Sequence, residues 1–148
     1  MPFVPERDIQ DAGLVTPHFG GWPCFHDAEI VRLTLQREKP TAYLEGVFHV
    51  FNQSHDSPEK RDRNHMLVTI RFEAIDQLRL EDFNRQNVID DLNVETVGGS
   101  GKRFTVGMLA NNGCDTAFLC DSIRVVSAEP YTRDERVQDA SVYANDLK

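Results

Sequence analysis

The sequence predicts a mainly β (α+β) protein, with an antiparallel sheet of about seven or eight short strands and one short helix. Short segments alternate apolar and polar residues with a period of two, which is typical of half-buried strands. Segments rich in glycine and asparagine separate them, as expected where hairpins turn. No strand–helix–strand rhythm, which would build a parallel sheet, runs through the chain.

Residues 1–27 are expected to be irregular, because prolines and glycines interrupt any long periodic run. One turn of helix is predicted at residues 8–14. A strand then begins at Glu29 and ends before Pro40. Its apolar face carries Val31, Leu33 and Leu35.

The next strand, Tyr43–Phe51, is apolar on both faces. Such a strand is central, covered on both sides, or part of an interface. A polar loop is expected over residues 52–64. The clearest alternation follows at residues 66–75, where Val68, Ile70 and Phe72 share one face.

A short helix is predicted over residues 82–91, with Asp82 as its N-cap. Four β-prone segments follow it, and the glycine-rich residues 98–101 and 111–113 fall between them where hairpins need positive φ. The four segments are 92–97, 103–110, 116–120 and 123–127. The predicted core consists of Leu33, Leu35, Phe48, Val50, Val68, Ile70, Phe72, Phe104, Val106, Leu119, Ile123 and Val125.

The chain has 148 residues and a formal net charge of -8. We expect a single mainly β domain over residues 1–131 and a polar C-terminal tail over residues 132–148. An acidic surface argues against nucleic-acid and anionic-lipid partners, which both require clustered Lys and Arg. No apolar run is long enough to cross a membrane, and the start does not read as a signal peptide. We therefore expect a cytoplasmic protein with three reduced cysteines, Cys120 among them buried.

His26, Asp27 and Glu29 place an imidazole and two carboxylates close together in the sequence. This set suits a metal site or an acid–base pair. On an extended chain, however, His26 and Asp27 point in opposite directions, and no His-x-x-x-His partner lies nearby. We favour a structural role before the first strand, with Asp27 accepting backbone hydrogen bonds. No catalytic residue, metal or cofactor is expected.

Other patterns also have structural interpretations. Gly98–Lys102 lacks the first glycine and the Ser or Thr of a P-loop, and a β-prone run follows it where a helix belongs. Residues 54–56 hold Ser, His and Asp on one loop, whereas a catalytic triad is assembled across a fold. His49 and His65 flank one loop, and we expect any approach between them to be incidental. Trp22 is expected to pack, with an exposed partner contact as the alternative.

Three segments of the chain form a recognisable set: residues 22–30 (WPCFHDAEI), 80–88 (LEDFNRQNV) and 120–130 (CDSIRVVSAEP). Together they resemble immunity protein family 50 of bacterial polymorphic toxin systems, over roughly residues 19–131. The resemblance implies a small, mainly β, cytoplasmic protein that neutralises a cognate toxin by binding it, and it carries over no catalytic residue. The motif residues of unassigned role are Trp22, Pro23, Phe25, His26, Asp27, Glu29, Phe83, Asn84 and Asn87.

Acidic residues gather around the middle segment, with only Arg85 among them. Acidic surfaces suit basic protein partners, because complementary fields speed encounter and orient the partner. A solvated surface that aids solubility is the alternative. The candidate partner-binding residues are Glu81, Asp82, Asp90, Asp91 and Glu95.

Three hypotheses of function follow. The first is a non-enzymatic immunity protein that binds a cognate, basic toxin. The second is a small metal-dependent or hydrolytic enzyme centred on His26, Asp27 and Glu29. The third is a structural module that self-associates as a homodimer, suggested by the two apolar faces of Tyr43–Phe51.

Overall fold

The computed structural model describes residues 2–37, 41–51, 64–98 and 101–132. Within them, nine strands form one sheet in the order β1-β9-β4-β3-β2-β6-β7-β8-β5. Every neighbouring pair is antiparallel except β1 with β9, so the sheet is mixed. In chain order the elements are α1 (Pro5–Asp8), β1 (Ile9–Gln10), η1 (Ala12–Leu14), α2 (Thr16–Phe19), β2 (Glu29–Gln36), β3 (Tyr43–Phe51), β4 (His65–Glu73), β5 (Asp76–Glu81), β6 (Val88–Thr96), β7 (Phe104–Asn112), β8 (Asp115–Cys120) and β9 (Ser122–Pro130).

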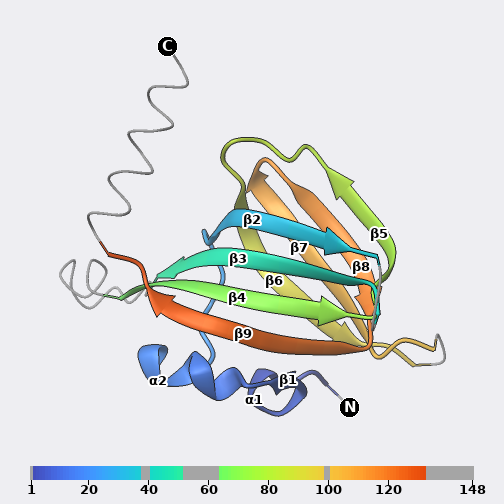
Figure 1. Ribbon diagram of the computed structural model, residues 1–148, viewed down its shortest axis with the longest axis horizontal. Coiled ribbons are helices and arrows are strands. Elements are labelled where there is room, and N and C mark those ends of the chain that lie inside the picture. Colours follow the sequence, from blue (N-terminus) through green and yellow to red (C-terminus); the bar gives the residue numbers. More distant parts are fainter. Residues whose placement is uncertain (1, 38–40, 52–63, 99–100, 133–148) are drawn as a thin grey trace.

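The sheet folds back on itself into two layers. Figure 1 shows β2, β3, β4 and β9 in front of β6, β7 and β8, and the strands of the two layers cross. The layers are joined where β2 begins: the amide of Ile30 donates to the carbonyl of Asn87 at 2.8 Å, and the amide of Ile89 donates to the carbonyl of Ala28 at 3.0 Å. Only the start of β2 pairs with β6, so the rest of β2 is free to diverge and the sheet can curl.

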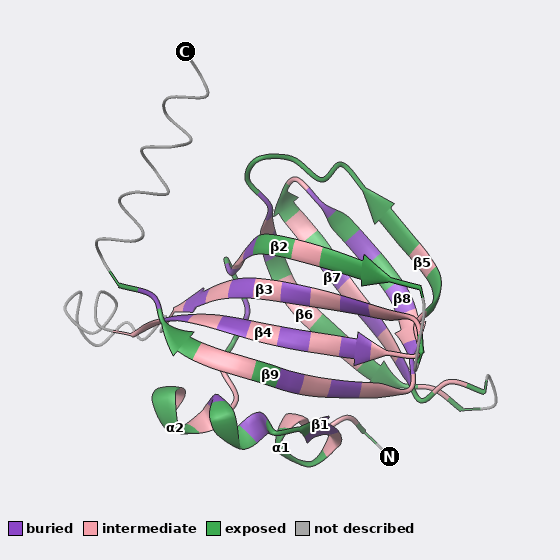
Figure 2. Ribbon diagram, in the orientation of Figure 1, coloured by how far each residue is buried: buried purple, intermediate pink, exposed green. Residues whose placement is uncertain are grey.

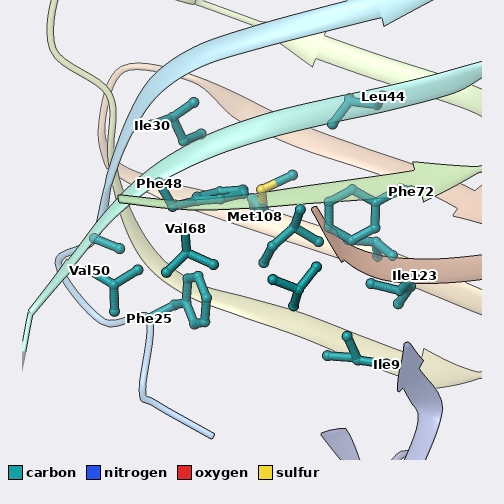
Figure 3. Close-up of a cluster of buried hydrophobic side chains, with 14 of the residues drawn as sticks. Ile9, Phe25, Ile30, Leu44, Phe48, Val50, Val68, Phe72, Met108 and Ile123 are labelled. Carbon is teal, nitrogen blue, oxygen red and sulfur yellow. The ribbon is translucent and has the colours of Figure 1, made fainter. Parts of the chain in front are cut away.

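The core lies between the two layers and follows the period of two. Buried and partly exposed residues alternate along the whole of β3 and β4 (Figure 2). Phe25 meets Phe48 edge to face, with ring centroids 5.6 Å apart. Figure 3 shows Phe72 and Met108 among the same side chains.

The N-terminal segment covers the side of the core next to β9. Ile9 pairs with Ile123 in a short parallel ladder. Ile9, Ala12 and Val15 are all buried in the core cluster. Figure 1 shows α1, β1 and α2 beside β9. The predicted turn of helix at 8–14 is therefore wrong in its bounds, because Ile9 is drawn into the sheet and the helical turns lie on either side of it.

Most of the predicted core is confirmed: Phe48, Val50, Val68, Ile70, Phe72, Phe104, Val106, Ile123 and Val125 are buried. Leu35 is wrong, with 50% of its surface exposed. A bulge between Ile30 and Arg32 shifts the alternation of β2, so Ile30 is buried while Leu33 is only partly buried. The prediction that Leu119 belongs to the core is also wrong. The inward positions of β8 are occupied by Thr116, Phe118 and Cys120.

The helix predicted over residues 82–91 is absent, since β5 ends at Glu81 and β6 begins at Val88. Asp82 adopts a positive φ of 60°, which a helix N-cap does not have. The side chain of Asn87 holds the loop closed instead: its Oδ1 accepts from the amide of Asn84 at 2.8 Å, and its Nδ2 donates to the carbonyl of Asn84 at 2.7 Å.

The apolar strand β3 is central in its layer, between β2 and β4. Its outward side chains contact their neighbours, since the Arg71 guanidinium lies 4.3 Å from the Tyr43 ring centroid and Phe51 stacks on His65. The interface role of this strand stays a prediction. The predicted loop at 52–64 and the tail at 132–148 fall almost wholly outside the described residues, as do residues 54–56.

The two ends of the sheet differ from its regular middle. At one end, β1 contributes only two residues beside β9. At the other end, the pairing of β5 with β8 is interrupted between Asp76 and Arg79, and Gln77 has a φ of 54°. Neither end strand therefore presents a long regular backbone edge.

Replacing Ile70 by alanine should destabilise the protein by about 2–5 kcal/mol, because a fully buried side chain is removed from a packed core. Leu35→Ala is the matched control, with an expected change of about 0.5 kcal/mol, since that leucine is half exposed. Urea unfolding of both variants measures the difference. Equal losses would contradict the alternation described for β2 and β4.

Candidate functional site

The turn before β2 lies between two buried residues, Phe25 and Ala28. His26 and Asp27 between them are exposed. The amide of Ala28 donates to the carbonyl of Phe25 at 2.9 Å and closes the turn. Asp27 has a φ of 64°, a left-handed conformation that short polar residues adopt more readily than most. The amide of Asp27 also donates to the carbonyl of Ile89 at 3.0 Å, which attaches the turn to β6.

This turn brings His26 and Asp27 together, contrary to the expectation that they point apart. His26 Nε2 lies 3.6 Å from Asp27 Oδ2, because the backbone at Asp27 is left-handed and not extended. His26 Nδ1 donates to the carbonyl of Asp90 at 2.8 Å and lies 3.3 Å from its carboxylate. Asn111 donates to Asp27 Oδ1 at 3.1 Å. The cluster therefore joins the turn to β6 and β7.

The surroundings of His26 favour its protonated form. The hydrogen bond to the Asp90 carbonyl and then the nearby charge of Asp27 raise the pKa of His26. About half of each side chain in the contact is exposed, so solvent screens these charges. The raised pKa favours the imidazolium at a solvent-exposed position, which suits electrostatic contact more than proton transfer inside a water-free site.

Glu29 does not complete a metal site with these residues. It lies in β2, opposite His49 on β3 and Val88 on β6. In the described part of the chain, no group of three or more His, Cys, Asp or Glu side chains is placed to hold a metal ion. His49 and His65 approach each other, with Nε2 and Nδ1 2.8 Å apart, and the Tyr131 ring packs edge to face on His49.

Trp22, in the first motif, packs as predicted. Trp22 stacks on Phe25 with ring centroids 5.7 Å apart and packs against the core cluster. Its amide donates to Glu6 Oε1 at 3.2 Å. Pro23 follows it, partly exposed, in the same irregular segment. These residues therefore fix the path of the chain into β2.

The middle motif is a loop that packs closely against a hairpin. Asn87 is buried, whereas Phe83 remains 49% exposed. Gly113, in the turn between β7 and β8, has a φ of 93°. A Cβ atom there would lie 2.6 Å from the carbonyl oxygen of Gln86 and 2.7 Å from Asn87 Oδ1. The predicted positive φ in this hairpin is confirmed, and glycine is required there by contact as well as by conformation.

The glycine-rich segment after β6 is also a hairpin in its described part. The amide of Val97 donates to the carbonyl of Arg103 at 2.8 Å, and Gly101 has a φ of 81°. The strand β7 follows it, not the helix that a phosphate-binding loop needs.

The acidic candidates do not form one surface. Asp90 contacts His26 at the junction of the layers, and Asp82 lies in the loop after β5. Glu81, Asp91 and Glu95 lie on strands and alternate with inward-facing neighbours. They therefore lie on the outward side of the layer that contains β6, β7, β8 and β5.

The three cysteines are free. Cys24 is exposed, whereas Cys114 and Cys120 are buried, as predicted for Cys120. Burial raises the pKa of the Cys120 thiol to about 12 and also raises the pKa of Cys114. Both buried thiols are thus kept protonated and unreactive at neutral pH.

The fold and these contacts define a class of protein. It is a small protein built on one β sheet that is folded into two layers. Motif residues connect the two layers where β2 and β6 begin. Acidic side chains face outward. The family described as Immunity protein 50 matches residues 12–131, and the chain belongs to this family. Searches of curated proteins and of solved structures found no match. Among the described residues, no helix is long and apolar enough to span a membrane.

Gly113→Ala should destabilise the protein by at least about 1–2 kcal/mol, because alanine resists the left-handed backbone and its Cβ would strike Gln86. Gly107→Ala is the control: a Cβ there meets nothing within 4 Å, and alanine suits a strand better than glycine. Thermal unfolding compares the two variants. A neutral Gly113→Ala would contradict the close packing of loop and hairpin.

Asp27→Asn should lower the pKa of His26, because the charge that favours the imidazolium is removed. Titration of the His26 ring signals by NMR measures this, with Asp91→Asn as the control that leaves this contact intact. Because the pKa of His26 is raised in the folded state, protonation of His26 stabilises the fold. This contribution is fully present below pH 6.5, the ordinary pKa of histidine, and is lost as the pH rises through the folded-state pKa. A His26 pKa that Asp27→Asn leaves unchanged would exclude the contact in solution.

Proposed function

We propose that this chain neutralises a cognate protein toxin by binding it directly, without catalysis. The observation that carries the proposal is its membership of the Immunity protein 50 family over residues 12–131. The part of the chain that matches includes both layers of the sheet. A family defined by immunity implies a toxin as partner, and binding is the simplest way for a small β protein to act on it.

The proposed partner is a basic protein. The chain carries 24 acidic side chains against 16 Lys and Arg, and such a surface attracts cationic partners and steers their approach. Toxins that act on nucleic acid present basic clefts, because their substrates carry phosphate charges. The same acidity disfavours nucleic acid and anionic membranes as partners of this chain.

The contacts of the His26 turn support a role in structure or binding over catalysis. His26 and Asp27 are held by Asp90 and Asn111, in a contact that fastens the turn to β6 and β7. The proposed compartment is the cytoplasm, where three free cysteines remain reduced.

Co-expression with the toxin of the adjacent open reading frame tests the proposal. We expect rescue of growth, a stable complex in pull-down, and an affinity that falls at least about tenfold between low and high salt. Failure both to rescue and to bind would overturn it. Stoichiometric metal in the purified protein that is lost in His26→Ala would favour the enzyme hypothesis instead. Light scattering of the chain alone distinguishes a monomer from a homodimer.

A further inference from the structure

We propose that the toxin docks on the outer sheet face, meaning the outward side of β6, β7, β8 and β5, and that it presents basic side chains around an apolar one. This inference rests on the proposed function and deepens it. The outer sheet face has a centre of Gly107, Leu109 and Ala117. Its rim consists of the carboxylates of Glu81, Asp91, Glu95 and Asp115.

The strand register places the centre and the rim on the same side of the sheet. Gly107 lies opposite Asn93 on β6 and opposite Ala117 on β8. Ala117 in turn lies opposite Arg79 on β5. The residues between them in sequence, such as Val106 and Phe118, are buried in the core. Because strand side chains alternate between faces, these opposed residues all point outward.

The centre of this face is open and partly apolar. A Cβ atom at Gly107 would meet nothing within 4 Å. Leu109 is 61% exposed, more than any other large hydrophobic side chain among the described residues. A hollow of about 190 Å³ adjoins Leu109 and is lined by Ala117, Thr116, Arg79, Glu81 and Asp115. A shallow apolar centre with a polar rim is the usual anatomy of a protein interface.

Most of the rim carboxylates have no cation beside them in the part of the chain that the structure describes. In the described residues, no Lys or Arg side chain lies within ion-pair distance of Asp91, Glu95 or Asp115. Arg79 lies 3.7 Å from Glu81 and is the one basic residue at this surface within the described strands β5 to β8. Within these four described strands, four outward carboxylates are accompanied by one guanidinium.

On the outward face of the other layer, two carboxylates have a cation beside them. Arg71 Nη2 lies 2.9 Å from Glu45 Oε2, and Arg124 lies 3.7 Å from Glu73. A basic partner gains little from carboxylates that already have a cation beside them. The contrast between the two layers thus favours the outer sheet face of β6, β7, β8 and β5 as the place where a basic protein binds.

The rim also discriminates between occupants. Phosphates of a nucleic acid would be repelled by the four carboxylates. A second copy of this chain, bound symmetrically through the same face, would bring like charges together. A basic protein that offers an apolar side chain to the hollow satisfies both the charge and the shape.

Gly107→Arg tests the docking surface, because it puts a large cation at the open centre without a clash inside the fold. Gly13→Arg is the matched control: it makes the same chemical change in η1, where a Cβ also meets nothing within 4 Å. The probe is the toxin of the adjacent open reading frame, and calorimetry measures its affinity for the full chain. We expect Gly107→Arg to weaken binding at least about 100-fold and Gly13→Arg less than about 3-fold.

A second pair of variants tests the charge. Glu95→Lys should slow association and flatten its salt dependence, whereas Glu129→Lys, at an exposed position of β9 in the other layer, should have a smaller effect. Thermal unfolding of each variant verifies that it is folded. If the toxin binds the unmodified chain and Gly107→Arg binds as tightly, the docking surface is wrong while the proposed function stands. If the unmodified chain binds no toxin, both are overturned.

Discussion

The short pairing between the start of β2 and the start of β6 is the contact on which the rest of the structure depends. It consists of a few backbone hydrogen bonds around Ala28, Ile30 and Asn87. Because this pairing ends after a few residues, the continuous sheet bends there, and its apolar side is enclosed between the two layers. A longer ladder would keep the two layers coplanar and leave Phe48 and Met108, which are now fully buried, without cover.

The same junction explains the polar residues of two of the motif segments. Asp27 adopts a left-handed backbone so that its amide reaches Ile89, and Asn87 closes the loop that delivers β6 to the junction. Gly113 leaves space for that loop. At the junction, His26 contacts Asp90 on β6, and Asp27 accepts a hydrogen bond from Asn111 on β7. His26 and Asp27, which suggest a reaction centre in the sequence, make contacts in the fold that connect the two layers.

Local patterns were sufficient to predict most of the strands and most of the core, because burial in β3 and β4 follows the period of two without interruption. They did not predict β1, or β5 as a strand of its own, and they assigned the start of β6 to a helix. They failed where backbone geometry departs from that period. The bulge after Ile30 exposes Leu35, and the positive φ of Asp82 replaces a predicted helix by a loop. The contact of His26 with Asp90 and the placement of Gly107 opposite Ala117 depend on strand order, which single segments do not encode. The acidic residues Glu81, Asp91 and Glu95 could be proposed for partner binding from the sequence, but the register that places them on one face with Gly107 and Leu109 could not.

The blunted ends of the sheet have a consequence for how this family can change. A two-residue β1 and a bulged β5 offer no long backbone edge to another chain, so under the proposed function a partner is recognised by outward side chains on paired strands. Those side chains contribute little to the core that holds the strands. Substitutions on the surface can therefore alter which partner is recognised while the hydrogen-bonded frame stays the same, and new specificities remain open to the chain without a new fold.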